Sequence, residues 1–291
     1  MTPAGGPAAA ARRAAQQSSL WRTLSPRNRS HLLILGLAAL VFAGVLGVRL
    51  AGGATVAEAA KGAVNPAVMV FLGWAVAREL DPDSPRSAFV AAGACGGILL
   101  AGSAPAGVTV AVLVALRIVV RTTGKAPTLL DLMGLTVLAA AIALTPRGWI
   151  GGVVVAAALA WDTRLPEPGP PRNHAGAVAV VGAGLAVAQL RDTFAVGFVP
   201  PGGGQWAAAA LGMAGLLLLK RYTPRSYQDR RKAPVRRERL LPGRALAGGT
   251  GAVAFALFGG VAIPLLAPLW GALMGVALHD RAIDFAAARR P

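Results

Sequence analysis

The sequence predicts an all-α integral membrane protein, a polytopic bundle of about ten transmembrane helices arranged as helical hairpins. Hydrophobic residues make up 55% of the 291 residues and charged residues only 14%, whereas a soluble domain carries about 25% charged residues. The apolar residues form long blocks, separated by short segments rich in glycine and proline. Basic residues gather at alternate ends of these blocks, which is the pattern that the positive-inside rule produces.

The first 30 residues are rich in Ala, Gly, Gln, Ser and Arg, and we predict that 1–30 is a disordered basic cytoplasmic tail. The following apolar run, 31–52, is long enough to cross a bilayer core of about 30 Å at about 1.5 Å per residue. Five arginines precede this run, so the N-terminus is expected in the cytoplasm. A second span, about 62–76, ends at Arg78.

Four hairpins account for the rest of the predicted transmembrane domain, which covers 31–281. Their paired runs are 89–102 with 108–120, 129–144 with 150–161, 175–190 with 206–219, and 246–262 with 267–278. An even number of spans places both termini, including a short tail at 282–291, on the cytoplasmic side of the cell membrane. A count of eight or nine remains open, because several runs are near the lower length limit.

The net charge of +17 raises the question of nucleic-acid binding. That function needs basic residues on a folded soluble face, whereas these arginines lie between apolar blocks and in tails, so we exclude it. The basic connector at about 220–244 has Asp229 and Glu238 as its only acids. We expect it to lie against anionic lipid headgroups of the bilayer, each basic residue contributing about 1 kcal/mol.

An acidic turn, Arg78–Arg86, is the most chemically dense stretch of the chain. Three carboxylates, Glu79, Asp81 and Asp83, lie within five residues of one another. Its two prolines favour extended backbone, in which the three side chains point roughly the same way. We hypothesise that they bind Mg²⁺ together with a substrate phosphate. The alternative is a solvated loop whose acids pair with nearby arginines.

Basic residues near this turn are candidates for binding a phosphate group, and they are Arg78, Arg86, Arg121 and Lys125. Lys125 follows Thr-Thr-Gly, but the segment lacks the upstream glycine and the following Ser or Thr of a P-loop. Asp131 is expected either to cap the next helix or to join this site.

Asp162 and Glu167 form a second, thinner acidic turn on the same face. Acidic turns after the second and sixth spans give a layout that resembles the UbiA-type prenyltransferases. Those enzymes use two Asp-rich motifs with Mg²⁺ and a prenyl diphosphate, although their Asn-Asp-x-x-Asp pattern is absent here.

Asn65-Pro66-Ala67 matches the pore motif of aquaporins. An aquaporin has two such motifs on opposed half-helices, and this chain has one. Pro66 is instead expected in the first turn of the second span, where its missing N–H does no harm.

Two function hypotheses follow. The first is a transporter or permease-like bundle for a small or lipid-like solute, which requires a cavity lined by polar groups near the midplane. The second is a membrane-embedded, Mg²⁺-dependent enzyme acting on a lipid phosphate or prenyl diphosphate at the cytoplasmic face. It requires the turns after the second, fourth and sixth spans to converge on one pocket.

Overall fold

The computed structural model describes Ser18, Leu20, Leu24 and residues 28–218, 224–228 and 233–288. Within these residues the fold is helical, and β-structure is limited to two isolated bridges. Most of the expected N-terminal tail and part of the basic connector lie outside the described residues.

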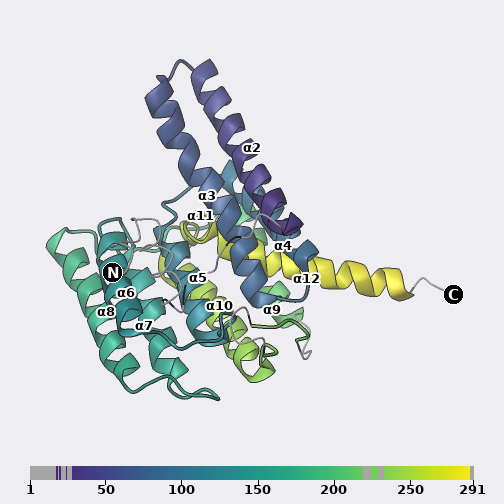
Figure 1. Cartoon of the computed structure of the whole chain (residues 1–291). Coiled ribbons are helices and arrows are strands. Elements are labelled where there is room, and N and C mark those ends of the chain that lie inside the picture. Colours follow the sequence, from purple (N-terminus) through teal and green to yellow (C-terminus); the bar gives the residue numbers. More distant parts are fainter. Residues whose placement is uncertain are drawn as a thin grey trace, which may run out of the picture.

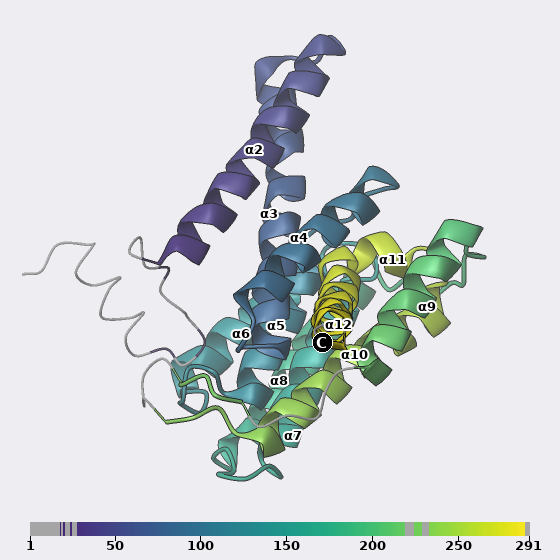
Figure 2. The same cartoon turned by 90° about the vertical axis from the view of Figure 1, so that its right-hand side faces the viewer.

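Eleven helices form the described part of the chain (Figures 1 and 2). They are α2 (Arg29–Ala51), α3 (Val56–Leu80), α4 (Pro85–Leu100), α5 (Gly107–Val120), α6 (Leu129–Ile142), α7 (Trp149–Asp162), α8 (Arg172–Leu190), α9 (Gly203–Leu218), α10 (Arg237–Phe258), α11 (Ala262–Leu265) and α12 (Ala267–Ala288). Each of them except the four-residue α11 overlaps one of the ten apolar runs of the sequence.

The apolar helices indicate a membrane-embedded protein. By length and composition, four of the described helices, α2, α3, α8 and α10, are able to cross a membrane. Other apolar helices, including α4 to α7, have only 14 to 16 residues. A 14-residue helix is about 21 Å long at 1.5 Å per residue, less than a bilayer core of about 30 Å.

Local capping sets the start of α3, six residues before the expected position. Glu58 N donates to Thr55 Oγ1 at 3.3 Å, and Thr55 N donates to Glu58 Oε2 at 3.0 Å, which forms a capping box. Pro66 therefore lies inside α3 and not in its first turn, so that expectation was wrong. The apolar run that begins at residue 62 did not indicate the more polar first turns of α3, which contain Glu58 and Lys61.

The expected hairpins are mostly not the packing pairs, which corrects that part of the predicted arrangement. Only α2 with α3 forms an extensively packed hairpin at the expected place; α6 and α7 touch less. The two helices of the other expected hairpins pack mainly on different elements: α4 on α12, α5 on α7, α8 on α6 and α7, and α9 on α12. A short loop brings two helix ends together but does not decide which faces pack.

The helix α12 runs across the others in Figure 1 and is seen nearly end-on in Figure 2. Glycines allow its close approach to its neighbours: a Cβ on Gly275 would lie 2.4 Å from Ala91 N in α4. The large ring of Trp270 is fully buried. Because α12 continues to Ala288, most of the segment expected as a C-terminal tail is helical.

Candidate functional site

The turns that follow α3, α5 and α7 meet at one end of the bundle, through Glu79 with Thr122 and Arg121 with Asp162. Glu79, in the last turn of α3, is 1% exposed. Its Oε1 accepts a hydrogen bond from Arg117 Nε of α5 at 3.0 Å, and its Oε2 accepts one from Thr122 Oγ1 at 2.6 Å. Both carboxylate oxygens are therefore satisfied by α5 and the turn that follows it.

Asp162, the last residue of α7, is fully buried and is the centre of a second group. Arg121 donates to it twice, from Nε at 3.1 Å and Nη2 at 2.9 Å. Arg239 Nη1 donates at 2.8 Å, and Asn173 Nδ2 donates at 3.1 Å. Arg121 has φ 55°, the left-handed conformation that ends α5.

The helix α10 begins at Arg237, before the apolar run that the sequence indicated, and Arg239 in its first turn is 1% exposed. Besides Asp162, it donates to the backbone carbonyls of Val119, Pro166 and Glu167 at 2.8 to 2.9 Å. A buried charge with this many partners fixes the relative positions of α5, α7 and α10. This group is structural.

The structure gives the three acids of the proposed Mg²⁺ site separate partners. Asp81 accepts from Ser87 Oγ at 3.1 Å, and Asp83 accepts from the backbone N–H groups of Arg225 and Ser226 at 2.8 Å each. Glu79 is still helical, so the extended geometry expected for all three acids was wrong. No group of three or more metal-binding side chains occurs among the residues described.

The four basic residues proposed for phosphate binding are also dispersed. Arg78 lies beside a cavity, and Arg121 is buried against Asp162. Arg86 and Lys125 are exposed. Arg78 is therefore the one member of this set that faces an extended space within the described part of the bundle.

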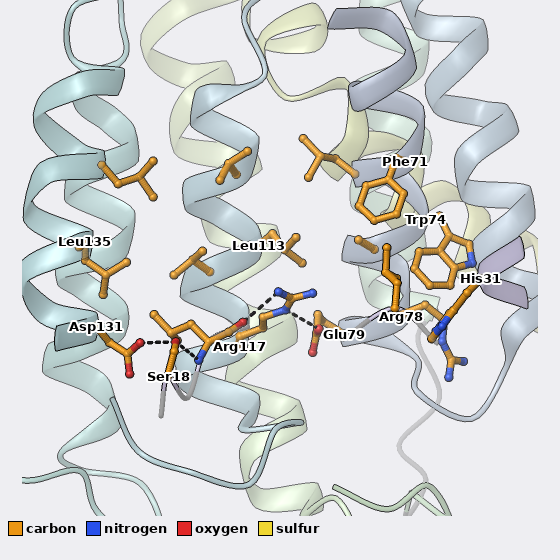
Figure 3. Close-up of a pocket in the computed structure, with 18 of the residues that line it drawn as sticks. Ser18, His31, Phe71, Trp74, Arg78, Glu79, Leu113, Arg117, Asp131 and Leu135 are labelled. Carbon is orange, nitrogen blue, oxygen red and sulfur yellow. Dashed lines mark hydrogen bonds and ion pairs between the residues drawn. The ribbon is translucent and has the colours of Figure 1, made fainter. Parts of the chain in front are cut away.

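That space is a cavity of about 970 Å³ between α3, α5 and α6, with the start of α2 at its edge (Figure 3). Its volume is at the upper end of the range for ligand pockets, about 300–1,000 Å³. Its walls are apolar, formed by Leu24, Phe71, Leu72, Trp74, Ala75, Val110, Leu113, Val114, Leu130, Gly134, Leu135 and Leu138. The cavity therefore suits a hydrocarbon chain.

One end of the cavity is ionic, and we call this end its floor, formed by Ser18, Arg78, Glu79, Arg117 and Asp131. Figure 3 shows Arg117 in the middle of the floor, bonded to Glu79. Arg117 Nη1 also donates to the Leu20 carbonyl at 3.0 Å. Ser18 Oγ donates to Asp131 Oδ1, so Ser18 and Leu20 lie against the floor.

Asp131 both caps α6 and joins this floor. Its Oδ2 accepts from Thr128 N and Oγ1 at 2.9 Å each, in a capping box. The sequence pointed to Asp131 for both roles, as a helix cap and as a member of a site. It gave no sign of Ser18, or of Trp74 as a cavity wall with the His31 ring edge-on at 5.7 Å.

At the opposite end of the bundle, Asn65 explains the apparent aquaporin motif. Its Nδ2 donates to the Ala104 carbonyl at 3.0 Å, and its Oδ1 accepts from Ala106 N at 3.0 Å. Asn65 therefore binds the loop between α4 and α5.

Comparison with protein-family models, with curated proteins and with solved structures finds no match for this chain. The cavity and its floor are thus the features from which a function is argued.

Proposed function

We propose that this chain is a permease-like membrane protein that carries a lipid-like solute. The single observation that supports this best is the cavity of about 970 Å³, with apolar walls and an ionic floor at one end. A lipid-like molecule has the same division into hydrocarbon and polar head. Polar side chains lie at one end of the cavity and not near the middle of the helices, where the transporter hypothesis expected them, and this favours a lipid-like solute over a small polar one.

The proposed topology places the ionic end of the bundle in the cytoplasm of a cell, with both termini on that side and ten spans in the cell membrane. The support is the gathering of basic residues there. Exposed cations of the connector, such as Arg236 and Arg237, are proposed to contact anionic headgroups. Arg239 and Arg244 are buried and do not contribute to that contact.

Leaflet exchange of a labelled lipid in proteoliposomes tests the proposal. The probe is phosphatidylglycerol with a fluorescent acyl chain, and the full-length protein is expected to accelerate its exchange over protein-free vesicles. Gly134→Phe places a ring in the cavity, where nothing described lies within 4 Å of an added Cβ. This substitution should remove at least about nine-tenths of the acceleration.

Gly182→Phe is the matched control, because Gly182 lies on α8 away from the cavity and its added Cβ also has open space. It should keep the wild-type rate. The proposal is overturned if wild-type protein gives only the protein-free rate, or if both variants slow exchange equally.

One observation favours the enzyme alternative: the turns after α3, α5 and α7 meet, through Glu79 with Thr122 and Arg121 with Asp162. We infer from it a second candidate, a Mg²⁺-dependent activity on a lipid phosphate or prenyl diphosphate. Release of phosphate from such a lipid by the purified chain, dependent on Mg²⁺ and lost in Asp81→Asn, would support it. Equal release with a chelator present would exclude it.

A further inference from the structure

We infer that the ligand of this cavity is an amphiphile with an anionic head, a carboxylate or a phosphate, held at Arg117. This inference rests on the proposed function and specifies the substrate class. It depends on which hydrogen-bonding groups of the floor are already used and which are available.

The acceptors of the floor are used. Glu79 Oε1 and Oε2 accept from Arg117 and Thr122. Asp131 accepts from Thr128 at one oxygen and from Ser18 at the other. A ligand that donates hydrogen bonds, such as an ammonium head, would have to displace one of these protein donors.

A donor of the floor remains available. Arg117 uses Nε for Glu79 and Nη1 for the Leu20 carbonyl, and Nη2 forms no hydrogen bond with any described residue. The Arg117 side chain is 15% exposed, and it lies where the apolar walls meet the floor (Figure 3). A guanidinium N–H binds an anionic oxygen more strongly than a neutral one.

The preference for an anionic head does not depend on a net positive charge of the floor. The two arginines of the floor, Arg78 and Arg117, formally balance Glu79 and Asp131. Selectivity therefore comes from the unfilled donor and from its low-dielectric surroundings, where a charge-assisted hydrogen bond is strengthened. The chain of the ligand would extend from Arg117 past Leu113 and Leu135, which lie above the floor in Figure 3.

Four probes that share one oleyl-type chain test the head-group preference: oleate, oleyl phosphate, oleyl alcohol and oleylamine. Their binding to the purified full-length chain is measured by scintillation proximity with radiolabelled probes, counting only the signal that Gly134→Phe removes. Oleate and oleyl phosphate should bind at least about tenfold more tightly than the alcohol and the amine. Inorganic phosphate alone should not compete, because it has no chain to fill the apolar walls.

Arg117→Gln should reduce the preference for the anionic probes to about twofold or less. Because this change leaves Glu79 without its cationic partner, the double variant Arg117→Gln with Glu79→Gln is measured beside it. The double variant should bind oleyl alcohol like the wild type and lose the anionic preference.

The outcomes separate the inference from the proposed function. Equal binding of the acids, the alcohol and the amine overturns the anionic head while leaving a lipid-binding cavity. Competition by inorganic phosphate as strong as that by oleyl phosphate overturns the amphiphile. If no probe gives a signal that Gly134→Phe removes, the proposed function itself fails.

Discussion

Arg121 and Asp162 face each other through two parallel hydrogen bonds, Nε to Oδ1 at 3.1 Å and Nη2 to Oδ2 at 2.9 Å. Arg121 directly follows α5, Asp162 is the last residue of α7, and both are almost completely buried. This pairing accounts for an arginine that the sequence offered as a phosphate ligand. It also shows that charge at this end of the bundle serves to hold helices together.

We expect Asp162→Asn to lower the free energy of unfolding by about 3–5 kcal/mol, because it leaves Arg121 and Arg239 buried without a carboxylate. Glu167→Gln is the control, since Glu167 pairs with Arg236 where both side chains are at least 40% exposed. That change should cost about 1 kcal/mol or less. Denaturant titration in detergent measures both, and similar losses for the two variants would contradict a structural role for Asp162.

Sequence reasoning located the ten long helices because each is an apolar run between polar or glycine-rich segments. It misplaced the starts of α3 and α10. Capping by Thr55 and burial of Arg239 extend these helices into polar sequence. Hydropathy records the cost of burying a charge and not the partners that offset it.

The candidate site was predicted only in part, because its contacts are distant in sequence. Arg117 bonds to Glu79 across 38 residues, and Ser18 to Asp131 across 113. The sequence hypothesis that the acidic turn lies near the Thr-Thr-Gly loop is met by one contact, the hydrogen bond from Thr122 Oγ1 to Glu79 Oε2. The number of spans and the direction of the chain across the membrane stay predictions.

Asp83→Ala should release the connector, because Asp83 accepts the backbone N–H groups of Arg225 and Ser226. Ser226 Oγ donates to Asp83 as well, and loss of these three hydrogen bonds, about 0.5–1.5 kcal/mol each, predicts at least roughly tenfold faster opening at this point. Limited trypsin digestion with mass spectrometry of the fragment cut after Arg225 measures it. Asp81→Asn is the control, because Asp81 bonds to Ser87 and should leave the cleavage rate unchanged. Unchanged cleavage in Asp83→Ala, with loss of Mg²⁺ binding, would support the metal hypothesis instead.

Asn65→Ala should lower the free energy of unfolding by about 1–3 kcal/mol, because it leaves the loop at Ala104 and Ala106 without its side-chain partner. Asn65→Asp keeps the acceptor for Ala106 N but loses the donor to Ala104, so an intermediate loss is expected. Water permeability of proteoliposomes should be the same for all three proteins. A drop in permeability with Asn65→Ala would instead indicate a pore.

Two Gly→Ala substitutions in long helices should change stability in opposite directions. At Gly275 a new Cβ would lie 2.4 Å from Ala91 N and 2.5 Å from Ala91 Cα, so α12 and α4 must move apart. The expected loss is about 1–3 kcal/mol. At Gly249 in α10 nothing in the described residues lies within 4 Å, and the higher helix propensity of alanine should add up to about 1 kcal/mol.

A second substitution tests whether the loss of stability in Gly275→Ala comes from the contact with Ala91 or from any change at this position of α12. Ala91→Gly removes the Cβ that would lie 2.8 Å from the new methyl group but leaves the closer backbone atoms in place. The double variant Gly275→Ala with Ala91→Gly should therefore recover only part of the loss. Full recovery in denaturant titration would mean that side chains alone set the distance between α4 and α12, against the backbone contact seen here.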